Sequence, residues 1–373
     1  MAARLGRRGR CVAARGRARA RPIVFVAMVG LGACGGSGSP ADPSAATTAP
    51  TTEAMAQATV AVTAGDADPS TSEPDPVRPT PLVGVGMTPR SYSADDFPVF
   101  LGEIEGRSDL LMHAGGWGDL TAPGSAFEVV VTLAREREMK SVVVLSPNSG
   151  GTLTTALDEA TVTSLLDSLR SFLASNQPEY LGLANEVNML ATDDPAAFEA
   201  VVALWQRALP IVRELSPATK VFVTFQYEWL VGRRDGWFGR TVVATDWSPL
   251  DRFGDADLVG LTTYPSLVFD TPSEIPSDYY AQIGEHTTLP LIFTEVGWTA
   301  DASLALLPGS DAEQVSYVEM LAEQAEAVAV EGLVWTFVHG EQVTDVPFAG
   351  MGLFAADGVP RPAFDAWMAR RGG

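Results

Sequence analysis

The sequence has 373 residues, a formal net charge of −21 and two cysteines. A strongly acidic surface repels nucleic acid and anionic lipid headgroups, so neither is an expected partner, whereas a neutral or cationic substrate fits the charge. Solubility alone also accounts for such a surface. Cys11 and Cys34 both lie near the N-terminus, which excludes disulfides, zinc–thiolate sites and cysteine nucleophiles from the rest of the chain.

Residues 1–33 have the features of a secretory signal peptide. Eight arginines and no acidic residue accompany an apolar stretch at 23–31, which is shorter than the ~20 residues that span a bilayer. The ending Leu31-Gly-Ala-Cys34 resembles a bacterial lipobox, which implies cleavage before Cys34, lipid on its sulfur, and an exported lipoprotein on the outer face of a bacterial membrane. The alternative is an ordinary signal peptide with an incidental cysteine. Losing eight arginines from a charge of −21 leaves −29 on the mature chain.

Residues 34–80 are rich in Ala, Thr, Ser, Pro, Gly and Asp and almost lack large apolar side chains. Such a segment buries too little surface to offset its chain entropy, so the sequence predicts a disordered tether. The lipid anchor would be the only link to the membrane. Residues 81–373 remain for one folded domain, and about 290 residues suffice to build a hydrophobic core.

The folded domain alternates short apolar runs with amphipathic stretches. The apolar runs are rich in Leu and β-branched residues without strict polar alternation, which is typical of strands buried on both faces. The pattern predicts a (β/α)8 TIM barrel, and a doubly wound open sheet is the alternative. The predicted strands are 82–86, 109–114, 141–146, 180–184, 221–225, 258–262, 291–294 and 333–338, and the predicted helices are 126–139, 159–174, 194–215, 311–329 and 360–370.

Two glutamates follow the predicted fourth and seventh strands. Glu186 ends the run Tyr180-Leu-Gly-Leu-Ala-Asn-Glu186, and Glu295 follows Leu291-Ile-Phe-Thr294. The active site of such a barrel lies at the carboxyl ends of its strands, and a carboxylate is costly to bury there unless it is paired or does chemistry. Either glutamate alone could be a helix cap or an ion-pair partner, but together they suggest the acid and nucleophile of a glycosidase.

Several short motifs resemble those of the large clan of retaining (β/α)8 glycoside hydrolases, which includes cellulases, mannanases and endo-β-1,4-galactanases. The resemblance covers roughly residues 82–370. Its motifs occur in the clan's order: Asn185-Glu186 at the fourth strand, Thr262-Thr-Tyr264-Pro265 at the sixth, Thr294-Glu295-Val-Gly-Trp298 at the seventh, Trp335 on the eighth, and the tail at 351–363.

The resemblance implies hydrolysis of a β-linked poly- or oligosaccharide by double displacement. Glu186 would be the acid/base and Glu295 the nucleophile. Asn185 would bind the 2-hydroxyl of the sugar, Tyr264 would orient Glu295, and Trp335 would form the floor of the central sugar subsite. A carbohydrate substrate, a monomer and no cofactor are therefore expected.

Other polar and aromatic residues at strand ends are predicted to bind substrate, because sugar sites combine flat rings with amides and acids. The tryptophans could instead be packing residues, and Glu228 could belong to a surface loop. The clan often has an arginine at the second strand; this chain has none there, and Arg90 after the first strand is the candidate replacement. The additional candidates are Arg90, His113, Trp117, Gln226, Glu228, Trp298 and His339.

Two other classes of function remain open. A non-catalytic sugar-binding lipoprotein on the same barrel is motivated by the missing second-strand arginine, and a lyase or transglycosylase is the third possibility. No pair among the three histidines has metal-ligand spacing, so no metal site is expected.

Overall fold

The computed structural model describes residues 80–149, 151–232, 244–304, 307–343 and 346–371. The predicted signal peptide, the lipidation site at Cys34 and all but the last residue of the predicted tether lie outside the described residues. Within the described ranges, no helix combines the length and the apolar composition needed to cross a bilayer.

The core of the fold is a ring of parallel strands, which confirms the predicted (β/α)8 barrel. Hydrogen bonds join neighbouring strands in the order β7-β6-β3-β2-β1-β11-β10-β9-β8. Their bounds are β1 (Leu82–Gly86), β2 (Leu110–Gly116), β3 (Lys140–Ser146), β6 (Tyr180–Gly182), β7 (Lys220–Phe222), β8 (Thr224–Gln226), β9 (Val259–Thr263), β10 (Leu291–Val296) and β11 (Val330–Trp335).

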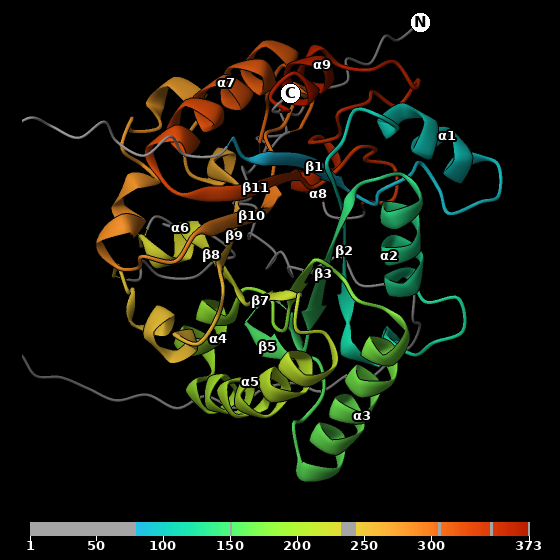
Figure 1. Cartoon of the computed structure of the whole chain (residues 1–373). Helices are drawn as coiled ribbons and strands as arrows, with labels where there is room; N and C mark the ends of the chain where they lie inside the picture. The colour runs from blue at the N-terminus through green and yellow to red at the C-terminus, as the bar shows by residue number, and fades with distance from the viewer. Residues whose placement is uncertain (1–79, 150, 233–243, 305–306, 344–345, 372–373) are drawn as a thin grey trace, which may run out of the picture. The chain divides into compact units, whose positions relative to one another are not determined.

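Strands β7 and β8 are the two halves of the predicted fifth strand, interrupted at Val223. β7 pairs with β6 and β8 pairs with β9, so the interrupted strand connects the two ends of the sheet and closes the ring. β1 pairs with β11, and Figure 1 shows the blue start of the barrel beside its red end. All eight predicted strands are therefore present in the predicted order.

Helices cover the outside of the ring (Figure 1). All five predicted helices are present, although Asp194 separates the fourth-strand connection into two helices. Its carboxylate accepts a hydrogen bond from the backbone N–H of Ala197 at 3.0 Å and so caps the second of them. The helices are α1 (Asp96–Ile104), α2 (Ala126–Glu136), α3 (Glu159–Ser175), α4 (Val187–Asp193), α5 (Pro195–Leu215), α6 (Tyr227–Leu230), α7 (Asp311–Ala327), α8 (Val346–Ala349) and α9 (Pro362–Met368).

Some connections differ from the prediction. Helix α1 was not predicted, because it is short and contains Pro98 and Gly102, both poor helix formers. Short 3-10 segments at Ser248–Phe253 and Ala281–Glu285 occupy the connections after the fifth and sixth strands. After β3 the chain forms a hairpin of β4 (Asn148–Ser149) and β5 (Thr152–Leu153).

Successive residues of each strand pack alternately inside the ring and between ring and helices. At Gly260 an added Cβ would lie 2.6 Å from the Phe222 ring, so only glycine fits at this crowded point inside the barrel. This inner layer fixes which residues of β9 and β10 face inward at the carboxyl end. The inner apolar cluster consists of Leu110, Met112, Val142, Val144, Tyr180, Phe222, Leu258, Ile292 and Val334.

Candidate active site

A β-bulge turns Glu295 toward the inside of the barrel. Phe293 of β10 pairs with Leu261 of β9, but the next pair is Glu295 with Thr262, so Thr294 is an extra residue on β10. Without this insertion, Glu295 would share the outward face of Phe293. Bulges of this kind re-aim side chains beside active sites. The Glu295 carboxyl group is half-buried, and it accepts a hydrogen bond from the Tyr264 hydroxyl at 2.7 Å.

Glu186 lies between β6 and α4 in a left-handed backbone conformation, with φ 51° and ψ 44°. This conformation is uncommon for a residue other than glycine and costs about 1–2 kcal/mol. A backbone contact holds it, because the Glu186 N–H donates to the Thr224 hydroxyl oxygen at 2.7 Å. The Glu186 side chain is only 2% exposed. A strained, buried carboxyl at a strand end is typical of a functional residue.

Thr262 links the two glutamates. Its hydroxyl donates to Glu186 Oε1 at 2.8 Å, and its backbone is the direct neighbour of Glu295 across β9 and β10. Adjacent strands lie about 4.8 Å apart. The two carboxyl groups, distant in sequence, therefore converge at the carboxyl end of the barrel, as the glycosidase prediction requires.

Burial and mutual repulsion separate the proton affinities of the two carboxyl groups. Burial, followed by the negative charges of Glu295 and Glu228, raises the pKa of Glu186 to about 8, against the opposing hydrogen bond from Thr262. Burial also raises the pKa of Glu295, but hydrogen bonds from Tyr264 and Asn185 stabilise its ionised form. The charge of Glu295 raises the pKa of Glu186 and not the reverse, so Glu295 is the first of the two to lose its proton and Glu186 keeps its proton longer.

Asn185 has a fixed orientation beside the two carboxyl groups. Its side-chain carbonyl accepts a hydrogen bond from the Thr224 hydroxyl, which leaves its NH2 group for Glu295. Its backbone carbonyl accepts a hydrogen bond from Asn148 Nδ2 at 2.7 Å. The structure thus brings four sequence-predicted residues together: Glu186, Glu295, Asn185 and Tyr264.

We expect Glu186→Gln to make the protein more stable near neutral pH. Below the ordinary glutamate pKa of 4.5 both folded and unfolded states hold the proton. Between pH 4.5 and about 8 the unfolded chain loses this proton while the folded protein keeps it, so the wild-type free energy of unfolding falls as pH rises. Glutamine removes this loss, which is worth about 3 kcal/mol at pH 7.

Thermal unfolding from pH 4 to pH 8 measures this effect. The stability difference between the variant and the wild type should be near zero at pH 4 and should grow steadily toward pH 8. A difference that does not change with pH would show that the Glu186 proton affinity is ordinary.

The three predicted substrate-binding tryptophans pack in the core. Trp335 is fully buried, contacts Trp367 of α9 with ring centroids 5.4 Å apart, and donates its indole N–H to the Met351 carbonyl. Trp298 packs beside Tyr317 of α7. Trp117 is also buried and donates to a backbone carbonyl. None of these three rings offers a free face to a sugar, so the platform role predicted for Trp335 is not part of our proposal.

Three other predicted ligands also make contacts within the protein. His113 packs edge-on against Phe127 of α2, on the outward side of β2, and its burial lowers its pKa to about 4. Gln226 and Glu228 are fully buried, and the Gln226 side chain donates to Glu228 at 2.6 Å. All three side chains thus make contacts within the protein.

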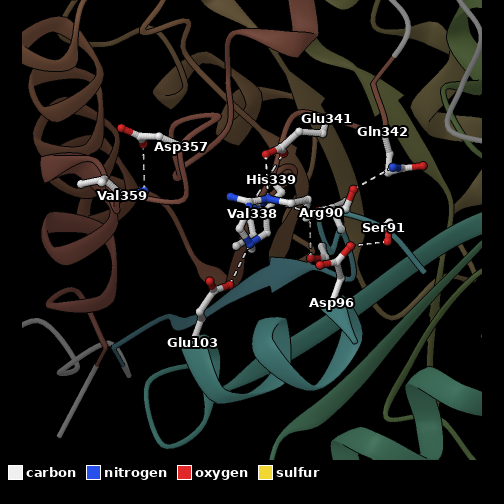
Figure 2. A network of polar contacts seen from close by, with 12 residues as sticks. Arg90, Ser91, Asp96, Glu103, Val338, His339, Glu341, Gln342, Asp357 and Val359 are labelled. Carbon is white, nitrogen blue, oxygen red and sulfur yellow. Dashed lines mark hydrogen bonds and ion pairs between the residues drawn. The ribbon is translucent and has the colours of Figure 1, made fainter. Parts of the chain in front are cut away.

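Arg90 and His339 belong to a separate network at the β1–β11 side of the barrel, shown in Figure 2. Arg90 pairs with Glu341 at 3.1 Å, and His339 Nε2 lies 2.8 Å from Glu103 Oε2 on α1. The described interactions that shift the pKa of Glu295 include no arginine. Arg90 therefore pairs with Glu341 and does not contact Glu295, as a replacement for the second-strand arginine would.

Two residues that contact the site were not among the predicted site residues: Thr262 and Thr224. Strand periodicity could have identified Thr262, because it lies two residues before Tyr264 and so on the same face of β9. Thr224 lies two residues before Gln226 and so on the same face of β8, which could have identified it by the same argument. Among the described residues, no group of three or more His, Cys, Asp or Glu side chains is arranged to hold a metal ion.

Neither a protein-family model nor a curated protein matches the sequence. A family 39 glycoside hydrolase from the gut symbiont Bacteroides cellulosilyticus WH2 has a similar fold, with TM-score 0.56 and 17% identity over 79% of this chain and 63% of that chain. The Ignisphaera aggregans GH53 catalytic domain gives TM-score 0.55 and 12% identity over 80% and 99%. An exo-β-1,4-mannosidase from Opitutaceae bacterium strain TAV5 gives TM-score 0.56 and 16% identity over 77% and 59%.

The match thus spans less than two thirds of the family 39 chain and of the mannosidase chain. The fold is the (β/α)8 barrel found in these glycoside hydrolases. At such identities the likeness concerns the fold alone, and any function must be argued from the site.

Proposed function

We propose that this protein is a retaining glycoside hydrolase that cleaves β-linked poly- or oligosaccharides, with Glu186 as acid/base and Glu295 as nucleophile. One observation carries the proposal: two carboxyl groups, one buried and one half-buried, converge at the carboxyl end of the barrel, and the charge of Glu295 raises the pKa of Glu186. The similarity in fold to glycoside hydrolases is consistent with this chemistry.

In the first step, Glu295 attacks the anomeric carbon and Glu186 gives its proton to the glycosidic oxygen. The glycosidic bond breaks, the leaving sugar departs as an alcohol, and a glycosyl ester forms on Glu295. This geometry needs carboxyl groups about 5–5.5 Å apart. The neighbouring positions of Thr262 and Glu295 support a separation of that order.

In the second step, Glu186 removes a proton from water, which attacks the anomeric carbon and releases Glu295. The ester carries no charge, so the repulsion that holds the proton on Glu186 is absent during this step. The pKa of Glu186 then falls, and the same residue becomes the base. The product keeps the β configuration because the anomeric carbon is inverted twice.

Neighbouring side chains support this division of roles. Tyr264 and Asn185 donate hydrogen bonds to Glu295, which keep it ionised and aimed at the anomeric carbon. Thr262 orients the Glu186 carboxyl group through Oε1. In this arrangement Asn185 also lies where it can bind the 2-hydroxyl of the sugar, as the sequence resemblance implies.

Incubation with β-mannan, β-glucan, galactan and xylan tests the proposal. We expect new reducing ends from at least one polymer, and NMR at early times should show the β anomer first. An α anomer as the first product would contradict the retaining mechanism. Binding of a polymer without release of reducing ends would favour a sugar-binding protein, and longer oligosaccharides among the products would favour a transglycosylase.

A further inference from the structure

Glu228 is a third buried carboxylate, and the two-step mechanism does not use it. It lies on the short helix α6 and is 0% exposed. A buried carboxylate is costly to desolvate, so its retention needs a compensating interaction.

Four neutral groups donate hydrogen bonds to Glu228, two to each oxygen. Oε1 accepts from the Thr263 hydroxyl at 2.6 Å and from the Tyr279 hydroxyl at 3.3 Å. Oε2 accepts from Gln226 Nε2 at 2.6 Å and from the Tyr264 backbone N–H at 3.2 Å. Burial raises the pKa of Glu228, and the hydrogen bonds from Thr263, Gln226 and the Tyr264 backbone N–H oppose this shift by stabilising the ionised form. The four donors fill the acceptor sites of the carboxylate. Glu228 therefore does not bind substrate, in contrast to the prediction from the sequence.

Three consecutive residues at the end of β9 connect this carboxylate to the other two. Thr262 points inward and donates to Glu186, whereas Thr263 points outward and donates to Glu228. Tyr264 contacts both sides: its backbone N–H donates to Glu228 and its hydroxyl donates to Glu295. Two bonds to Glu228 thus fix the segment that carries the two donors of the active site.

We propose that Glu228 is a positioning residue, whose carboxylate holds the carboxyl end of β9 so that Thr262 and Tyr264 stay directed at Glu186 and Glu295. The proposal rests on the proposed function, because it takes those two glutamates as acid and nucleophile.

Electrostatics provides a second link. The negative charge of Glu228 opposes ionisation of Glu186 and so contributes to its raised pKa. The other titratable groups that respond to this charge are Tyr280 and Tyr317, and burial raises the pKa of both. Both tyrosines stay neutral in the pH range where Glu186 titrates. A change of charge at residue 228 should therefore appear as a change in the pKa of Glu186.

Two substitutions separate position from charge. Glu228→Gln keeps the volume, removes the charge and brings an NH2 group against a donor. We expect kcat to fall roughly 10–100-fold with little change in KM, as for a small misplacement of catalytic groups, and the alkaline limb of the pH–rate profile to move to lower pH. Glu228→Asp keeps the charge on a side chain that is one methylene shorter. It should lower kcat and leave the alkaline limb in place.

Glu331→Gln is the matched control. Glu331 lies on β11 and pairs with Lys220 at 2.5 Å, inside the same barrel but at the amino ends of the strands. Its loss should lower the melting temperature without moving the pH–rate profile. If Glu228→Gln does not fold, Tyr279→Phe removes only the longest of the four bonds and should lower kcat by a smaller factor at unchanged KM.

A second measurement does not depend on turnover. NMR of 13C-carboxyl-labelled glutamate follows the titration of Glu186, which should shift to lower pH in Glu228→Gln. Unchanged kcat and unchanged Glu186 titration in Glu228→Gln would overturn the proposal, as would a kcat loss that follows thermal stability alone. Absence of hydrolysis by the wild type would refute the proposed function, and the NMR titration would still decide the link between Glu228 and Glu186.

Discussion

Replacing Glu295 with alanine is expected to lower kcat/KM by a factor on the order of 10⁴ or more, because removal of a nucleophile eliminates the covalent route altogether. The fold should persist. Burial raises the pKa of this carboxyl group, so the folded protein holds it at a cost that alanine removes. Hydrolysis of the best polymer and thermal unfolding, measured on the same preparation, test both expectations.

A small anion gives this experiment its positive control. In Glu295→Ala, azide fits the space left by the carboxylate and attacks the anomeric carbon from the same side, while Glu186 still protonates the leaving group. The expected product is the α-glycosyl azide. Glu331→Ala, which removes a carboxylate at the opposite end of the barrel, should retain full activity. Wild-type activity in Glu295→Ala would eliminate Glu295 as the nucleophile.

The strand sequences were sufficient to predict the barrel. Runs such as 141–146 and 291–294 are apolar on both faces, as the strands of a barrel surrounded by helices must be, and their spacing leaves room for crossover helices. The interruption at Val223 could not be predicted, because it depends on how the segment pairs with the strands on its two sides.

The same apolar character explains why the sequence did not reveal that Trp335 packs in the core. A strand without polar alternation does not show which residues face inward. Val334 belongs to the inner cluster, so its neighbour Trp335 must face the helices. Both residues are apolar, so the sequence does not show which of the two faces inward. Position at a strand end is therefore a weak guide to substrate contact.

Glu295 illustrates the opposite case. Ile292 faces inward, so simple alternation would point Glu295 outward, and only the extra residue Thr294 corrects its direction. The motif around Glu295 identified it without any knowledge of the bulge. Alternation along the strand predicts the wrong direction for Glu295, whereas the short motif around it pointed to the residue that the bulge turns inward.

Replacing Glu186 with alanine should give a loss that depends on the leaving group. Natural β-glycans need protonation at the glycosidic oxygen, so their hydrolysis should fall by a factor of roughly 10²–10⁴. A 2,4-dinitrophenyl glycoside leaves without a proton, and its first step should keep most of its rate. The second step then lacks a base, so the glycosyl ester on Glu295 should accumulate after a burst of dinitrophenol.

Azide separates the acid/base role from the nucleophile role. In Glu186→Ala it attacks the glycosyl ester on the face opposite Glu295, so the product should be the β-glycosyl azide, of opposite configuration to that from Glu295→Ala. The alkaline limb near pH 8 should also disappear, since the group that titrates there is absent. Equal losses for the natural glycan and the dinitrophenyl glycoside would mean that Glu186 transfers no proton, and the raised pKa would then reflect burial alone.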